Sequence, residues 1–108
     1  MLKIVPTPEF SKQVKKLSKS YKKIVEDLEF LKNELLQNPK CGTDLGNNCY
    51  KIRIPNSSIP TGKSGGFRVI TYCMIDDNLI RLLLIYTKTE KETVSDKEIQ
   101  EVIQNNKL

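Results

Sequence analysis

The sequence predicts an α+β domain of the order β-α-α-β-β-β-α, in which a helical hairpin packs on one face of a mostly antiparallel four-stranded sheet. Apolar residues recur every three or four positions between residues 7 and 38, which is the spacing of one helix face. Three apolar, β-branched runs follow between residues 49 and 86, and turn-forming residues separate them, as expected for neighbouring strands. At 108 residues the chain is expected to form one domain, residues 1–108, with a single modest core.

The first third of the chain predicts a short strand and two helices. Residues 2–5 are a strand candidate that Pro6 ends. Residues 7–9 form a helix start, with Thr at the N-cap, Pro in the first helical position and an acid in the first turn. Residues 18–20 mark a turn to a second helix, which stops at residues 38–39, so an antiparallel hairpin is expected. The predicted apolar stripes are Phe10, Val14, Leu17 and Tyr21 in the first helix and Val25, Leu28, Leu31 and Leu35 in the second, where Ile24 widens the buried face.

The middle of the chain predicts three strands. Residues 41–48 are expected to form a loop that leads into the first of them, Cys49–Ile54, whose residues alternate between apolar and basic. Residues 55–66 predict a flexible connector, longer than a tight hairpin needs. Residues 67–75 form the next strand, and residues 79–86, apolar on both faces, predict a strand in the interior of the sheet.

The chain ends in a predicted helix. Ser95 and Glu98 have the spacing of a capping box, which marks the start of a helix. Ile99, Val102 and Ile103 give this helix a narrow apolar face. We expect the hairpin to leave the opposite face of the sheet partly open, and a ligand could lie there.

The composition indicates which partners and sites the protein could have. Eighteen Lys and Arg residues against thirteen Asp and Glu residues give a net charge of +5, which favours a polyanionic partner. The chain has no His, and its three Cys residues lack C-x-x-C spacing, so we expect neither a metal site nor a cofactor. No apolar run is long enough to span a bilayer, and Pro6 breaks the first apolar run too early for a signal peptide, so a cytoplasmic protein without membrane contact is expected.

Three segments together carry a family resemblance. They are Tyr50–Ile54, Gly62–Tyr72 and Leu84–Lys91, in this order and spacing after a helical hairpin. The chain resembles the RelE/ParE superfamily of type II toxins, most closely its HigB-type RelE-like branch. The resemblance covers nearly the whole chain.

The resemblance implies an enzyme that acts on RNA. Toxins of this branch bind the ribosomal A site and cleave the mRNA that lies there by attack of a ribose 2′-OH on the adjacent phosphate. They are metal-independent endoribonucleases that inhibit translation, and an antitoxin from the same operon, with which the toxin oligomerises, holds them inactive. The implied partners are therefore the cognate antitoxin, the ribosome and mRNA.

The resemblance also implies site residues. Lys51 and Arg53 match the basic pair on the strand after the hairpin, and alternation places them on one face about 7 Å apart. Arg68 matches the Arg at the start of the next strand, where a planar guanidinium suits a pentacovalent phosphate. Lys88 and Lys91 match cations that follow the last strand. Thr89 and Ser95 depart from the family, since some RelE proteins carry Arg and a catalytic Tyr at about these positions.

The other candidates follow from residue chemistry. Tyr86 could stack on a base or donate a proton, and it could equally close the core. Glu90 could be the general base or could orient a Lys or Arg, and Lys63 could grip RNA from the connector. Which residue is the general base and which the general acid stays open.

Two rival functions remain. A ParE-like gyrase inhibitor would need no phosphate-transfer site, so the basic strand residues disfavour it. A catalytically silent RNA- or ribosome-binding module is the second alternative, and the departures at Thr89 and Ser95 support it. The alternative without a function for Lys51 and Arg53 is that they are the solvent-facing side chains of an edge strand.

Overall fold

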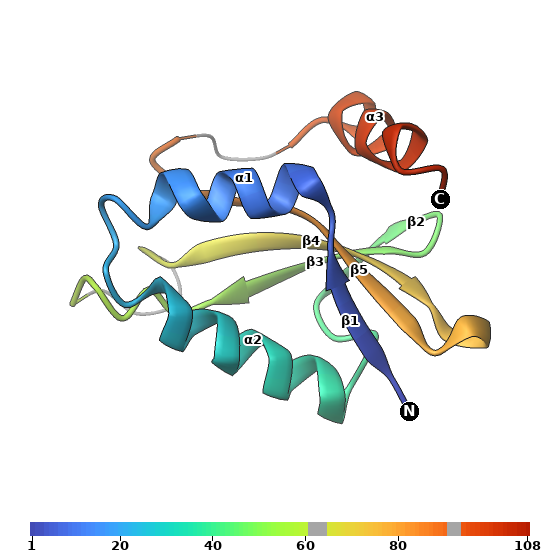
Figure 1. Ribbon diagram of the computed structural model, residues 1–108, viewed down its shortest axis with the longest axis horizontal. Helices are drawn as coiled ribbons and strands as arrows, with labels where there is room; N and C mark the ends of the chain where they lie inside the picture. The colour runs from blue at the N-terminus through green and yellow to red at the C-terminus, as the bar shows by residue number, and fades with distance from the viewer. Residues whose placement is uncertain (61–64, 91–93) are drawn as a thin grey trace.

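The computed structural model describes residues 1–60, 65–90 and 94–108 (Figure 1). The chain forms three α-helices and a five-stranded sheet within these ranges. In chain order the elements are β1 (Lys3–Pro6), α1 (Pro8–Leu17), α2 (Ile24–Gln37), β2 (Thr43–Gly46), β3 (Cys49–Ile54), β4 (Phe67–Met74), the 3-10 turn η2 (Ile75–Asp77), β5 (Leu79–Thr87) and α3 (Asp96–Asn105).

The sheet has the strand order β1-β5-β4-β3-β2. β1 runs parallel to β5, and the other three pairs of neighbours are antiparallel. The predicted α+β class and the mostly antiparallel sheet are therefore confirmed. The strand with apolar residues on both faces, β5, lies in the sheet interior between β1 and β4, as predicted.

The predicted number of strands was wrong, because the segment expected to be a loop contains β2. Gly46 pairs with Cys49 across a two-residue turn of Asn47 and Asn48. Both Asn residues have the positive φ, 51° and 67°, that a type I′ hairpin turn requires, and Asn tolerates this backbone better than most residues. β2 is exposed along its whole length, so its four residues show no apolar alternation that would reveal a strand.

Helices α1 and α2 form the predicted hairpin and cover one face of the sheet. They diverge from their connecting turn, and β1 crosses the open end (Figure 1). Thr7 caps α1 as predicted, because its Oγ1 accepts the amide of Phe10 at 3.2 Å. The same hydroxyl donates to the Leu82 carbonyl at 3.0 Å and so fastens α1 to β5. The hairpin and the sheet enclose the first of two hydrophobic cores between them. It contains Phe10, Leu17, Ile24, Leu31 and Leu35 from the helices and Ile52, Ile54, Phe67, Val69, Cys73, Ile80, Leu82 and Ile85 from the sheet.

Helix α3 packs on the opposite face of the sheet. Ser95 and Glu98 form the predicted capping box at its start. Ile99, Val102 and Ile103 are buried in a second core with Cys49, Ile70, Leu83, Leu84 and Tyr86 of the sheet. Helix α3 therefore covers part of the face that the hairpin leaves open.

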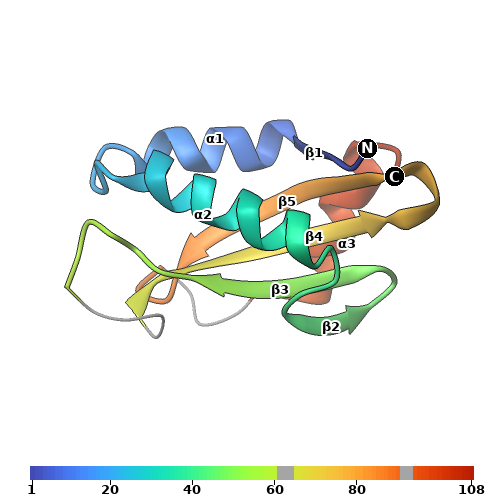
Figure 2. The ribbon, with the colours of Figure 1, turned by 90° about the horizontal axis from the view of Figure 1, so that it is seen from below.

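Figure 2 shows the strands side by side, with β2 at the edge beyond β3. The β2 pairing reaches only from Cys49 to Lys51 of β3.

Among the described residues, no helix is long and apolar enough to cross a membrane.

Candidate phosphate-binding site

Three of the predicted residues meet in one row across the sheet. Arg53 of β3 pairs with Arg68 of β4, and Arg68 pairs with Tyr86 of β5. Residues that pair directly point to the same face of a sheet, so the three side chains are neighbours. Tyr86 belongs to the second core, and this places the row on the face where α3 lies.

Lys51 lies one step along the same face. It pairs with Ile70, which in turn pairs with Leu84, and both of these residues belong to the second core. Alternation along β3 directs Lys51 and Arg53 away from the hairpin, while Ile52 and Ile54 are buried beneath it. Lys51 is half-buried and Arg53 is exposed. The predicted basic strand pair is therefore present, with Arg53 open to an anionic ligand.

Arg68 is buried at the start of β4. Its side chain is 4% exposed, and Nη1 donates to the Gly66 carbonyl at 3.0 Å. A charged group is rarely buried without strong partners, because leaving water is costly. The guanidinium is thus held in place at the start of β4.

Gly66 makes this arrangement possible. A Cβ at Gly66 would collide with the carbonyl oxygen of Ile54 and would lie 3.1 Å from the Cα of Pro55. The end of β3 and the start of β4 therefore approach more closely than any other residue would permit. This approach positions the carbonyl that accepts the bond from Arg68.

The chain beyond β3 is fastened to α2. The backbone amide of Ser57 donates to Oδ2 of Asp27 at 3.0 Å, and the Ser57 hydroxyl donates to Oδ1 of the same carboxylate. Asp27 is 1% exposed, and the amide of Lys23 donates to the Ser58 hydroxyl at 3.0 Å. The first residues of the predicted flexible connector are thus anchored close to Arg53. No motif in the sequence marks Asp27, which lies on the helix beside apolar positions.

Tyr86 packs within the second core and is 2% exposed. Of the two roles left open by the sequence, packing is the one visible in these contacts. Lys88 and Glu90 are exposed and directly follow β5. Lys63 and Lys91 lie outside the described residues.

The carboxylate of Glu90 bonds back to the end of β5. Its Oε1 accepts the backbone amide of Thr87 at 3.2 Å and the Thr87 hydroxyl at 3.3 Å. Thr87 was not among the predicted site residues, although Thr87 and Glu90 have the spacing of a capping box. That spacing is the signal by which sequence reasoning could have found it.

The arrangement suits an anion. Lys51, Arg53 and Arg68 share one face, and Lys88 lies two residues beyond Tyr86. Cations clustered against a partly buried surface attract a phosphodiester more strongly than the same charges spread in water. In the part of the chain that the structure describes, no group of three or more His, Cys, Asp or Glu side chains could hold a metal ion.

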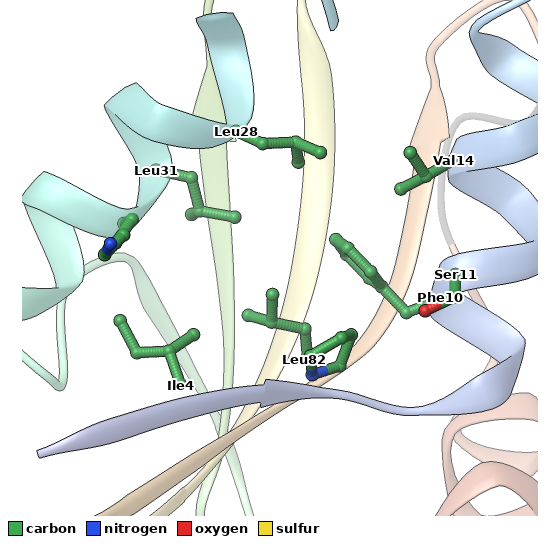
Figure 3. Close-up of a pocket in the computed structure, with 9 residues that line it drawn as sticks. Ile4, Phe10, Ser11, Val14, Leu28, Leu31 and Leu82 are labelled. Atoms are coloured by element: carbon green, nitrogen blue, oxygen red, sulfur yellow. The ribbon is translucent and has the colours of Figure 1, made fainter. Parts of the chain in front are cut away.

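A second feature is an apolar groove on the hairpin side. A pocket of about 250 Å³ opens between α1 and α2 above β1, and its side chains point toward one another (Figure 3). An adjoining hollow of about 390 Å³ continues past α2 and shares four lining residues with it. Val25 and Leu36 on this stretch are 69% and 48% exposed. The groove is lined by Ile4, Phe10, Val14, Leu28, Leu31, Lys32 and Leu82, and its extension by Leu2, Val25, Glu29 and Leu36.

Comparison with known proteins identifies the fold. No family model matches the chain, and no curated protein matches its sequence. Among solved structures, the chain is similar to the E. coli toxin RelE, in a double arginine-to-alanine mutant studied in the free state. The TM-score is 0.60, the identity is 15%, and the match covers 94% of each chain. The chain therefore has the fold of the toxin RelE.

Proposed function

We propose that this protein is the toxin of a type II toxin–antitoxin system and inhibits translation as a ribosome-dependent mRNA endoribonuclease. The observation that carries the proposal is the row Arg53–Arg68–Tyr86, with Lys51 beside it, on a RelE-like sheet. The fold alone would not be enough, because one fold hosts many functions. Residues 50–54, 62–72 and 84–91 support the HigB-type branch, and a cytoplasmic site of action follows from the ribosome as partner.

The chemistry needs few protein groups. The 2′-oxygen of the RNA attacks the adjacent phosphorus while the bond from phosphorus to the 5′-oxygen breaks, which leaves a 2′,3′-cyclic phosphate and a 5′-hydroxyl. The nucleophile belongs to the substrate, so the proposal assigns no metal and no cofactor. Arg68, with Lys51 and Arg53, stabilises the charge that develops on the phosphoryl oxygens.

Proton transfer requires a base at the 2′-hydroxyl and an acid at the leaving oxygen. Lys88 and Lys91 are candidates for these roles, since a lysine amine can exchange a proton with the substrate and both residues follow β5 in the sequence. Tyr86 is a third candidate, and Lys63 would contact the RNA backbone.

Primer extension on a translated mRNA tests this function. After induction of the wild-type protein we expect cleavage within the reading frame, dependent on translation. A purified assay of DNA supercoiling by gyrase is run in parallel and should be unaffected. Inhibited supercoiling with intact mRNA would support the ParE-like alternative, and ribosome binding with intact mRNA the silent binding module.

We further propose that the apolar groove receives an antitoxin. Monomeric proteins rarely expose a continuous apolar surface of this kind without a partner. An amphipathic helix or an extended apolar segment could fill the space between α1 and α2, while Lys32 at the rim would meet a carboxylate.

Replacing Val25 and Leu36 with lysine tests the groove. Both side chains are largely exposed, so we expect the double variant to fold and to remain toxic. Co-expression of the adjacent small reading frame should then fail to restore growth, although it restores growth with the wild-type toxin. Equal rescue of both proteins would place the antitoxin elsewhere.

A further inference from the structure

Hydrogen bonds between Thr87 and Glu90 close a turn directly after β5. Glu90 Oε1 accepts the Thr87 amide at 3.2 Å, and the Glu90 amide donates to the Thr87 hydroxyl oxygen at 3.3 Å. The Glu90 amide also donates to the Thr87 carbonyl at 3.2 Å, and the hydroxyls of Thr87 and Thr89 lie 2.9 Å apart. Thr87 is 3% exposed, so this set of bonds is anchored at a buried residue.

The pattern is that of a capping box without its helix. At Ser95 the same reciprocal bonds, of 3.4 and 3.1 Å to Glu98, begin α3. At Thr87 they instead end a strand and enclose Lys88 and Thr89 in a turn. In a capping box the acidic residue serves as a hydrogen-bond acceptor, and Gln serves equally well. The bonds of Glu90 therefore require an acceptor oxygen and not a negative charge.

We propose that Glu90 is a positioning residue that holds the turn after β5, and hence Lys88, against the site. This inference rests on the proposed function for what the turn positions. Thr87 pairs with Phe67, the neighbour of Arg68, so the turn continues directly from the strands that carry the row Arg53–Arg68–Tyr86. Glu90 acts through Thr87 and takes no proton from the RNA.

The decisive comparison is Glu90→Ala against Glu90→Gln in translation-dependent mRNA cleavage. Alanine removes the acceptor, and we expect a loss on the order of 100-fold, because small misplacements of catalytic groups have costs of that size. Glutamine should rescue cleavage to within about threefold of the wild type, with an unchanged pH profile, because its amide oxygen keeps the acceptor. A general base would instead give equal losses in both variants, on the order of 10²–10⁴-fold.

Glu98 supplies the matched control. Glu98→Ala breaks the corresponding bond at the start of α3, where no residue of the row Arg53–Arg68–Tyr86 takes part, and should leave cleavage unchanged while lowering thermal stability. Glu90→Ala with full cleavage, or Glu90→Gln as inactive as Glu90→Ala, would each overturn the proposal. Circular dichroism of each variant confirms that it is folded.

Amide hydrogen exchange separates this inference from the proposed function. The Thr87 amide should exchange slowly in the wild type and in Glu90→Gln, and at least tenfold faster in Glu90→Ala. If the wild type cleaves no mRNA while this exchange pattern holds, the proposed function fails and the turn stands. If Thr87 exchanges equally in all three proteins, the turn itself is refuted, whatever the activity.

Discussion

Replacing Arg68 with alanine is expected to lower mRNA cleavage by a factor on the order of 10²–10³, the usual cost of removing one donor to a developing oxyanion. Arg68 is the central residue of the row, flanked by Arg53 and Tyr86 on neighbouring strands. Its guanidinium is held by the Gly66 carbonyl, so its orientation does not have to be restored at each turnover. Growth after induction and primer extension measure the loss.

Burial of Arg68 makes the choice of controls important. Arg68→Lys keeps the charge but not the planar fork, and we expect intermediate activity from it. Arg81 of β5 lies on the same face of the sheet as Arg68, because it pairs with Tyr72 of β4. Its Nε donates to the Val5 carbonyl at 3.1 Å. Arg81→Ala should retain cleavage. If the Arg68→Ala protein is fully toxic, Arg68 is not part of the site. If that variant does not fold, the activity of Arg68→Lys decides.

Gly66→Ala is expected to reduce the free energy of unfolding by about 3 kcal/mol, the upper range for an added methyl group in a packed region. The new Cβ would overlap the Ile54 carbonyl oxygen, and neither backbone can move without breaking the pairing of Ile54 with Phe67. The same shift would displace the carbonyl that holds Arg68. Urea denaturation measures the stability, and primer extension should show reduced cleavage at a temperature where the variant is still folded.

Gly46 offers a contrasting control. Its φ is 84°, but no atom beyond Gly46 and its two neighbours in the chain lies within 4 Å of the position where a Cβ would stand. Gly46→Ala should cost only the left-handed backbone strain, about 1 kcal/mol. Equal losses at Gly46 and Gly66 would mean that the close approach of β3 and β4 is not what Gly66 provides.

Local patterns predicted most of this fold. Thr7 and Ser95 marked the two capped helix starts because a cap depends on a few adjacent residues. The strand β2 was missed because all of its residues are exposed, and only the Asn47–Asn48 turn could have indicated it. The parallel pairing of β1 with β5 depends on tertiary contacts, which no local pattern encodes.

The side-chain directions along β3 were predictable from the sequence, but the burial of Arg68 was not. Alternation along β3 correctly separated Lys51 and Arg53 from the apolar face. The burial of Arg68 depends on the approach of two strands at Gly66, and the bonds of Glu90 depend on a backbone turn. Both arise from backbone geometry, which the pattern of residue types along the chain does not encode.

The bond from Thr7 to the Leu82 carbonyl joins residues 75 positions apart, and within the described ranges β1 pairs with β5 alone. The amino-terminal strand must therefore wait for the last strand to be synthesised before it can be incorporated. Such long-range pairing slows folding. A chain that ends before β5 can complete neither the sheet nor the row Arg53–Arg68–Tyr86. During translation the amino-terminal strand would thus stay unpaired until residues 79–87 have left the ribosome.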